Sequence, residues 1–369
     1  SSDVCSSDLM IAKRKLFSLL LAGIGLLFGS SSGLAAEPLT VRIGFASVGA
    51  DNRQFSGGSS AAVAHSEHYL DQALHDRPDV KVEWYFFKGA GPAVNEAFAN
   101  NQLDFAIQGD LPEIIGRANG LKTRILLASG AHAPIYLAVP FGSAIRKVAD
   151  LRGRKVSIFR GTNNHLAAVK VLAGNGLQER DVQIINMDTA TTNAALTSKD
   201  IDAAFGNFPL ASLAEKNIAE IIYTTKGDNP AYERHSTLIG QDAFIKAHPD
   251  ITQKIVSAIV RAARWASDEA NREAFFEISA RTGFPASGYR FDFSNQELKY
   301  RNTPIIDASI IESYRVQARQ AREFGLLRRD VDLNGWFDRS FLDIALKEQG
   351  LVGYWQEYDA SGRPQAAGQ

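Results

Sequence analysis

The chain has 369 residues with 40 basic and 41 acidic side chains, so its formal net charge is −1. This balance excludes a polybasic nucleic-acid binder and an acidic solvating tail as the main function of the chain. A single cysteine, Cys5, excludes a disulfide framework and a thiolate-rich zinc site. At about 150 residues per domain, the length corresponds to roughly two domains of ordinary globular sequence.

The N-terminus has the pattern of a secretory signal peptide. Met10 is followed by three basic residues, then by an apolar run and a small-residue segment. The apolar run is shorter than a typical transmembrane helix. An uncleaved N-terminal anchor is the alternative interpretation. We therefore expect residues 1–9 to be an artefact of the gene model and residues 10–36 to be a signal peptide, cleaved after Ala35 or Ala36. The mature chain should then be a soluble protein of the periplasm.

Strands and helices alternate along most of the mature chain. Buried strands are predicted at 41–46, 80–87, 103–107, 124–129, 135–139, 155–159, 182–186, 201–205 and 218–224. Helices are predicted at 59–75, from Gly91 and from Asp110. Pro92 fits a first helical turn, where its missing N–H costs nothing. From Ile251 onward the pattern is almost wholly helical. This rhythm predicts an α/β fold with mainly parallel sheets flanked by helices.

Two segments repeat the same order of residue types. Residues 103–112 (LDFAIQGDLP) and 201–209 (IDAAFGNFP) each place a short strand, a polar residue and a proline before a helix. Chance convergence is the alternative, because junctions between strands and helices draw on few residue types. The repeat predicts two similar α/β lobes that face each other, with ligand bound beyond the carboxyl ends of the strands.

The clearest candidate for ligand binding is the segment 159–165 (FRGTNNH), between a predicted strand and a predicted helix. Gly161 permits a tight turn, and the helix start offers free N–H groups and partial positive charge. An anion could therefore bind here without a metal. Helix capping by Thr162 or Asn163 is the simpler alternative. The candidate ligand-binding residues in this segment are Thr162, Asn163, Asn164 and His165.

Two further strand ends carry candidate residues. Gly109 and Asp110 follow one strand, and Asp110 with Glu113 forms a pattern typical of a capping box. Because an ionised aspartate would repel an anion, ligand contact by Asp110 is one interpretation and helix capping is the other. Asn207 and Phe208 follow another strand, where Asn207 contacts ligand or caps a helix. Phe208 forms either an apolar wall of the cleft or ordinary core.

The seven histidines do not predict a metal site. His65 and His68 are three residues apart on a predicted helix, but the spacing places no third ligand for zinc. His132 and His165 are better placed for ligand contact than for metal binding. The sequence contains no Walker-type loop, nucleophile elbow or dinucleotide fingerprint, so we predict no catalytic constellation, no cofactor and no enzyme activity.

In combination, the segments 89–92 (GAGP), 103–112 and 150–165 resemble periplasmic binding proteins for aliphatic sulfonates, taurine and nitrate. The resemblance covers residues 40–340 and implies the two-lobed type II periplasmic binding fold. It implies that two crossing segments, near 133–140 and 234–241, join the lobes. The implied domains are lobe 1 at 38–135 and 238–285, lobe 2 at 136–237, a C-terminal helical segment packing on the lobes at 286–356, and a flexible tail at 357–369.

By this resemblance, the protein captures a small organic anion between its lobes and delivers it to the membrane permease of an ABC importer. Residues 109–110 and 162–165 would line the cleft. We also expect a monomer without a nucleic-acid partner.

Two departures from the family pattern leave the identity of the ligand open. Asn207-Phe208-Pro209 stands where sulfonate binders commonly have Trp-Asp-Pro, and the loop 47–60 is longer than usual and carries Phe55. Alkyl or aryl sulfonates, sulfate esters, taurine and nitrate remain candidate ligands. An enzyme on the same fold, similar to pyrimidine-precursor synthases, is the alternative function. Those enzymes use a cysteine-rich segment that this chain lacks. A sensor domain of a transcription regulator is a third possibility, but it conflicts with the signal peptide.

Overall fold

The computed structural model describes residues 38–365, so the predicted artefact, the predicted signal peptide and the last four residues of the predicted tail lie outside the described residues. The strands are β1 (Leu39–Phe45), β2 (Val80–Phe86), β3 (Phe105–Gly109), β4 (Thr123–Ala133), β5 (Tyr136–Pro140), β6 (Lys155–Ser157), β7 (Gln183–Ile185), β8 (Ala203–Gly206), β9 (Ala219–Thr224) and β10 (Arg234–Gln241). The α-helices are α1 (Ser60–Ser66), α2 (Tyr69–Ala73), α3 (Ala90–Ala99), α4 (Asp110–Ala118), α5 (Asn163–Gly174), α6 (Thr189–Ser198), α7 (Pro209–Glu215), α8 (Asp242–Ala247), α9 (Pro249–Ala266), α10 (Arg272–Ala280), α11 (Ala286–Asp292), α12 (Leu298–Arg301), α13 (Ala308–Glu323) and α14 (Ser340–Glu348). Short 3-10 helices lie at η1 (Ala50–Asn52), η2 (Val148–Leu151), η3 (Glu179–Asp181), η4 (Pro230–Tyr232) and η5 (Glu269–Asn271).

The strands form two five-stranded sheets with the same layout. Their orders are β2-β1-β3-β10-β4 and β7-β6-β8-β5-β9. In each sheet the fourth strand, β10 or β5, pairs antiparallel with both neighbours, whereas the first three strands are parallel. The α/β class is therefore confirmed, with each sheet mixed and four of its strands running in one direction. We call the first sheet with its helices lobe 1 and the second sheet with its helices lobe 2.

The antiparallel strand of each sheet is the one that follows a crossing from the other lobe. β4 ends at Ala133 in lobe 1 and β5 begins at Tyr136 in lobe 2, so the first crossing takes two residues. The second crossing runs from 225 to 233, between β9 and β10. The segment 234–241, expected to cross between the lobes, instead lies within the first sheet as β10, between β3 and β4.

The repeated sequence segments occupy equivalent places in the two sheets. β3 leads into α4 and β8 leads into α7, and each of these strands is third in its sheet, beside the antiparallel strand. The carboxyl ends of β3 and β8 therefore belong to corresponding edges of the two sheets. This arrangement agrees with the predicted repeat.

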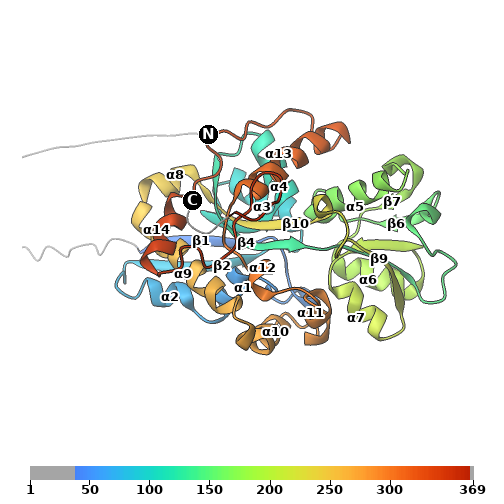
Figure 1. The fold of residues 1–369 in the computed structure, drawn as a ribbon, viewed down its shortest axis with the longest axis horizontal. Coiled ribbons are helices and arrows are strands. Elements are labelled where there is room, and N and C mark those ends of the chain that lie inside the picture. Colours follow the sequence, from blue (N-terminus) through green and yellow to red (C-terminus); the bar gives the residue numbers. More distant parts are fainter. Residues whose placement is uncertain (1–37, 366–369) are drawn as a thin grey trace, which may run out of the picture. The chain divides into compact units, whose positions relative to one another are not determined.

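Each sheet is buried on both faces, which explains the continuous apolar runs of its strands. In β5, Leu137 and Val139 join the core under α5, whereas Tyr136 and Ala138 join the core under α6 and α7. This alternation follows from the two-residue period of a strand. Figure 1 shows α5 on one side of the second sheet and α6 with α7 on the other.

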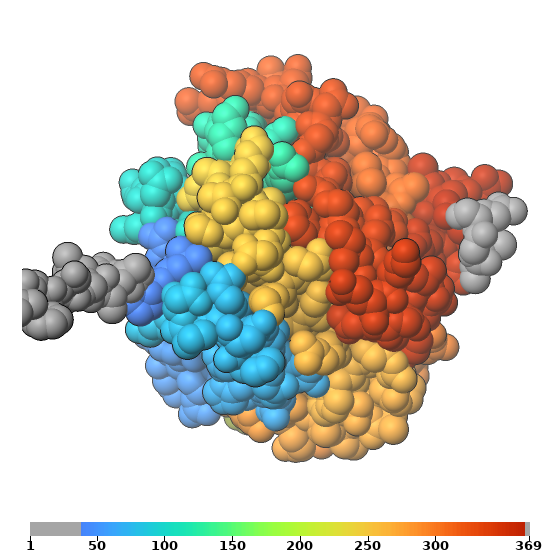
Figure 2. All heavy atoms as spheres, turned by 90° about the vertical axis from the view of Figure 1, so that its left-hand side faces the viewer, coloured from blue at the N-terminus to red at the C-terminus, as the bar shows by residue number. Residues whose placement is uncertain are grey.

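In lobe 1, β1 buries alternate side chains against α9, and α9 also packs against α1, α2 and α14. Figure 2 shows this side of the molecule, where the yellow segment of α8 and α9 lies between blue residues near α2 and the red C-terminal residues. On the other face of the sheet, α4 packs against α13. The C-terminal residues thus complete the cover of the first sheet.

Two local differences from the sequence prediction have clear causes. The single helix expected at 59–75 is divided, because His68 adopts a left-handed conformation (φ 57°) between α1 and α2. The tail predicted from residue 357 makes specific contacts, since the Tyr358 N–H donates to Asp307 Oδ2 at 2.9 Å. From Asp242 to Glu348 the secondary-structure elements are all helices, as predicted for the C-terminal part.

Candidate ligand-binding site

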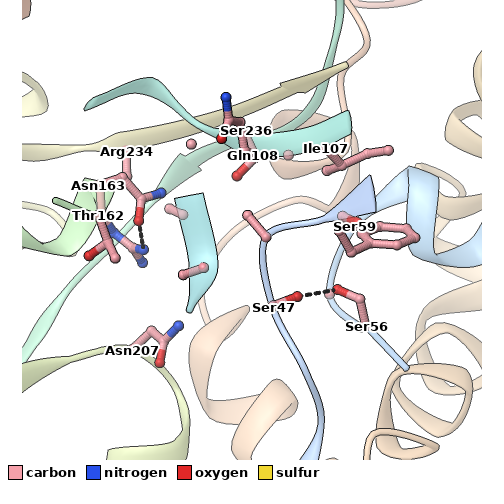
Figure 3. Close-up of a pocket in the computed structure, with 18 of the residues that line it drawn as sticks. Ser47, Ser56, Ser59, Ile107, Gln108, Thr162, Asn163, Asn207, Arg234 and Ser236 are labelled. Carbon is pink, nitrogen blue, oxygen red and sulfur yellow. Dashed lines mark hydrogen bonds between the residues drawn. The ribbon is translucent and has the colours of Figure 1, made fainter. Parts of the chain in front are cut away.

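A cavity of about 250 Å³ lies between the carboxyl ends of the strands of both lobes. Ser47 and Gln108 line it from lobe 1, and Thr162 and Asn207 line it from lobe 2. Arg234, the first residue of β10, lines it where the second crossing ends. Figure 3 shows these side chains around the cavity. The site thus lies where open α/β sheets bind ligands.

Four helices of nine or more residues begin at the cavity wall. Their lining residues are Ala90 in α3, Gly109 before α4, Asn163 in α5 and Thr189 in α6. The first N–H groups of a helix have no partner within the helix and carry partial positive charge. Two of these helices come from each lobe. Their starts therefore favour a negatively charged ligand between the lobes.

Helix capping does not account for Thr162 and Asn163. Thr162 is the N-cap residue of α5, but its side chain accepts no helical N–H and its hydroxyl donates to the Phe159 carbonyl at 2.7 Å. Asn163 Oδ1 accepts from Arg234 Nη1 at 3.4 Å (Figure 3). A Cβ on Gly109 would lie 2.5 Å from Asn163 Nδ2, so the approach of the lobes here requires a glycine.

Arg234 is a buried cation whose side chain forms no ion pair within 4 Å among the described residues. Nη2 donates to the Pro134 carbonyl and Nη1 donates to Asn163, while Nε has no hydrogen-bond partner. Burial lowers the pKa of the Arg234 guanidinium to about 10, so it stays charged near neutral pH. A buried charge without a directly paired counter-ion is unfavourable, and an anion in the cavity would relieve that cost.

Arg301 also lines the cavity, but its charge is already neutralised. Its Nη2 forms an ion pair with Asp292 Oδ2 at 2.7 Å, and both side chains are buried. Tyr136 OH donates to the other oxygen of Asp292 at 2.9 Å. Among the described lining residues none carries a carboxylate. Arg234 is therefore the lining cation that has no ion-pair partner within 4 Å among the described residues, and the carboxylates of Asp292 and Asp110 attract it only from a greater distance.

The remaining wall is part hydroxyl and part aromatic. Ser47 Oγ and Ser56 Oγ lie 2.9 Å apart in the loop after β1 (Figure 3). On another side, the rings of Phe208 and Tyr289 are tilted against each other with centroids 4.2 Å apart, and Phe284 meets Phe208 edge-on at 5.5 Å. The cavity can therefore take a molecule with both a charged polar end and an apolar part.

Asp110 lies behind the cavity wall rather than on it. Its carboxylate is buried, accepts from the Leu111 N–H at 2.8 Å and from the His235 N–H at 2.9 Å, and also accepts from Gln317 at 3.2 Å. The predicted capping box does not form, because Gly109 is the N-cap and Glu113 bonds to Thr237 and Tyr314. Burial raises the pKa of Asp110 above its usual value.

Four other predicted residues also lie away from the cavity wall. His165 Nδ1 accepts from the Gly161 N–H, so Nε2 carries the proton that it donates to Glu179 at 2.9 Å. His132 Nδ1 lies 2.7 Å from Glu233 Oε2, and its ring stacks on Tyr300 at 3.9 Å. The other two residues are Asn164, whose Oδ1 is buried without a partner, and Phe55, which packs edge-on against His65.

Of the predicted residues, the cavity brings together Gly109, Thr162, Asn163, Asn207 and Phe208. Their contact with a ligand stays a prediction. The sequence prediction missed Gln108, Arg234 and the serines of the loop after β1. The sequence shows Arg234 only as a basic residue at the start of the mixed segment RHSTLIGQ, and nothing in its local pattern places it at the cavity.

Within residues 38–365, no three histidine, cysteine, aspartate or glutamate side chains are arranged so that they could hold a metal ion. None of the described helices has the length and apolar character needed to cross a bilayer.

Comparison with known proteins points to one family. A family model described as "NMT1/THI5 like" matches residues 79–272, just over half of the chain. A protein of Escherichia coli (strain K12) named "Putative aliphatic sulfonates-binding protein" is 31% identical over 196 residues, and the match covers 52% of this chain and 56% of that protein. The chain thus spans little more than half the length of this relative.

Solved structures share the fold over almost their whole length. The "putative sulfonate ABC transporter, periplasmic sulfonate-binding protein SsuA" of Methylobacillus flagellatus KT is 29% identical, with a TM-score of 0.73, over 88% of this chain and 98% of that chain. The desulfurization enzyme DszB is 18% identical, with a TM-score of 0.64, over 84% of this chain and 99% of that chain. At that identity the likeness to DszB concerns the fold alone. The same fold therefore serves both binding proteins and an enzyme.

Proposed function

Because the chain belongs to the NMT1/THI5-like family, we propose that it is the extracytoplasmic solute-binding protein of an ABC importer. It captures a small organic anion with a sulfonate-like head group and delivers it to a membrane permease. It is exported to the periplasm through a cleaved signal peptide and works there as a monomer without a cofactor. It is not an enzyme.

The observation that carries this proposal is the buried guanidinium of Arg234. Its Nε has no partner, and the lining residues that the structure describes include no carboxylate to neutralise it. A sulfonate is fully ionised at neutral pH and offers three acceptor oxygens, which suit a guanidinium and helix N–H groups. The anionic head would lie near Arg234, Thr162 and Asn163. The organic part would lie against Phe208 and Tyr289.

Ligand binding is coupled to closure of the lobes around two short crossings. Lys88, just before α3 in lobe 1, lies 3.4 Å from Asp188, the N-cap of α6 in lobe 2. These two residues flank the lining residues Ala90 and Thr189, so their ion pair joins the lobes beside the cavity. A ligand that contacts both lobes favours the closed arrangement over an open one.

Thermal-shift screening followed by calorimetry tests the proposal. The chain from residue 37 onward is titrated with alkyl and aryl sulfonates, sulfate esters, taurine and nitrate. We expect at least one organosulfonate to raise the Tm, because a ligand that binds only the folded state stabilises it. Alkylammonium salts of the same chain length serve as the control. If no sulfonate shifts the Tm while another class of ligand does, the proposed ligand is wrong.

The likeness to DszB makes turnover the second readout. Each ligand that binds is incubated with the protein at a concentration above its Kd and analysed by mass spectrometry. We expect the ligand to be recovered unchanged. A product that forms in proportion to protein concentration would show that the protein is an enzyme and would contradict the proposed binding function.

A further inference from the structure

Gln108 presents an unpaired hydrogen-bond acceptor at the cavity. It lies on β3, is 2% exposed and lines the cavity, and its Oε1 has no hydrogen-bond partner. Oε1 lies 3.4 Å from the position that a Cβ on Gly91 would take, and Gly91 also lines the cavity. A buried acceptor without a partner lowers the stability of the unliganded protein. A group that fills the cavity can remove this cost only by donating a hydrogen bond.

The direction of the Gln108 amide is fixed by a chain of hydrogen bonds that ends on the backbone. The Pro112 carbonyl can only accept, and it accepts from Asn95 Nδ2 at 2.7 Å. Asn95 must therefore present Oδ1 to Gln108, whose Nε2 donates to it at 3.2 Å. Turning the Gln108 amide over would oppose two acceptor oxygens. Oε1 is consequently the atom that remains without a partner.

The charge around the cavity limits what kind of donor suits this acceptor. Arg234 is already a buried cation, and a neutral amide oxygen cannot neutralise a second one. A ligand ammonium group would lose its hydration here, with no carboxylate among the described lining residues to compensate. A hydroxyl or an amide N–H donates without that cost. The wall is thus suited to a neutral donor.

We propose that Gln108 makes this protein selective for organic anions whose tail carries a neutral hydrogen-bond donor, with hydroxyalkanesulfonates preferred over plain alkanesulfonates and over aminoalkanesulfonates. This inference rests on the proposed function, because it assumes that a sulfonate-like head binds in the same cavity. A site that hydrogen-bonds a donor group rejects the analogue lacking it, since its own polar atom is then left unpaired.

Isothermal titration calorimetry with matched ligands tests the inference. The probes are ethanesulfonate, 2-hydroxyethanesulfonate and taurine, together with the corresponding three-carbon series. For at least one chain length we expect the hydroxy form to bind at least about tenfold more tightly than the plain form. Equal affinities within each series would overturn the inference while leaving the proposed function intact. If none of the probes binds and no other sulfonate does, the proposed function itself fails.

Variants of Gln108 assign the preference to its side chain. Gln108→Leu should retain binding of the plain alkanesulfonate and reduce the preference for the hydroxy form to less than about threefold. Gln108→Glu adds a negative charge and should shift the preference toward the amino form. Gln102→Leu, at an exposed glutamine on the approach to β3, is the matched control and should keep the preference. If Gln108→Leu keeps the full preference, Gln108 is not the selective residue.

If the leucine variant fails to fold, Gln108→Met supplies the same loss of the acceptor in a flexible side chain. Its Tm without ligand is measured first, so that a folded variant is compared with a folded protein.

Discussion

Two buried polar regions lie back to back around the start of α4 and differ in how fully they are satisfied. The buried network consists of Asp110, Glu113, Thr237, Tyr314 and Gln317, and each of its carboxylates accepts hydrogen bonds from protein groups. The cavity wall includes Gln108 and Arg234, each of which keeps one polar atom without a partner. Both regions involve β10, yet only the cavity wall leaves groups for a ligand.

Structural and functional polar residues of this protein can therefore be told apart by whether their hydrogen bonds are complete. A buried polar group whose hydrogen bonds are complete stabilises the fold, because removing it leaves its partners without hydrogen bonds. An unsatisfied one weakens the unliganded fold and gains its partner when a ligand binds. Substitutions in the buried network should therefore lower stability, and substitutions in the cavity wall should lower affinity.

The largest expected effect on stability is that of Asp110→Ala. It leaves the His235 N–H and the Gln317 amide without their buried acceptor, so the free energy of unfolding should fall by about 3 kcal/mol. Urea denaturation monitored by circular dichroism measures the change. A loss below about 0.5 kcal/mol would contradict the structural role of Asp110.

Lys170 should make stability depend on pH in the alkaline range. Burial lowers the pKa of its ammonium group to about 8, and Nζ donates to the Ala231 carbonyl at 2.8 Å. The unfolded chain binds this proton up to about pH 10.4, whereas the folded chain loses it above pH 8, so stability should rise between these values.

The comparison of the wild-type protein with Lys170→Met isolates this effect. Relative to the variant, the wild-type protein should gain about 3 kcal/mol of unfolding free energy between pH 8 and pH 10.5. Urea denaturation at both pH values measures the gain, and the titration of other lysines cancels in the difference. A difference that does not change with pH would show that Lys170 is not buried as described.

Tyr314→Phe should have a smaller effect within the buried network. The Tyr314 hydroxyl donates to Glu113 Oε2 at 2.5 Å, and its removal should lower the free energy of unfolding by about 1–2 kcal/mol. Ligand affinity should stay within about twofold of the wild type, because Tyr314 is not a lining residue. Tyr85→Phe, at an exposed tyrosine, is the control. A marked loss of ligand affinity without a loss of stability would indicate that Tyr314 contributes to ligand binding.

Asn163→Ala should have the smallest effect, and on affinity rather than on stability. Asn163 accepts from Arg234 and abuts Gly109 across the lobes, so its loss should weaken ligand binding about fivefold. The Tm without ligand should change little, because the side chain does not cap α5. Calorimetry and a thermal melt on the same sample give both values. An unchanged ligand affinity would show that Asn163 does not contribute to ligand binding.

The fold could be predicted from the sequence wherever burial follows a local pattern. The apolar runs of β1, β5 and β8 are visible because both faces of each sheet are covered. β10 was not recognised as a sheet strand, because Arg234, His235 and Thr237 are polar and are buried only through contacts with other parts of the chain. The polar turn at Thr162 and Asn163, in contrast, could be predicted, because the end of a strand and the start of a helix are visible in the local sequence.

The rest of the candidate site depends on contacts between distant segments. Arg234 reaches the cavity because the second crossing returns the chain beside β3, and no local spacing encodes that. Asp110 was placed at a strand end correctly, but β10 covers its carboxylate and turns it toward the buried network. Gln108 gains its significance from Asn95 and Pro112, whose hydrogen bonds determine its orientation.

The affinity of Arg234→Met for an organosulfonate that stabilises the wild-type protein tests the central claim most directly. The variant removes the buried cation that lacks an ion-pair partner and keeps an apolar side chain of similar length. Because it also leaves the Pro134 carbonyl without its donor, its Tm without ligand should change little. Calorimetry should show affinity reduced by about 100-fold or more. A variant that binds the same sulfonate within about threefold of the wild-type affinity would contradict the account.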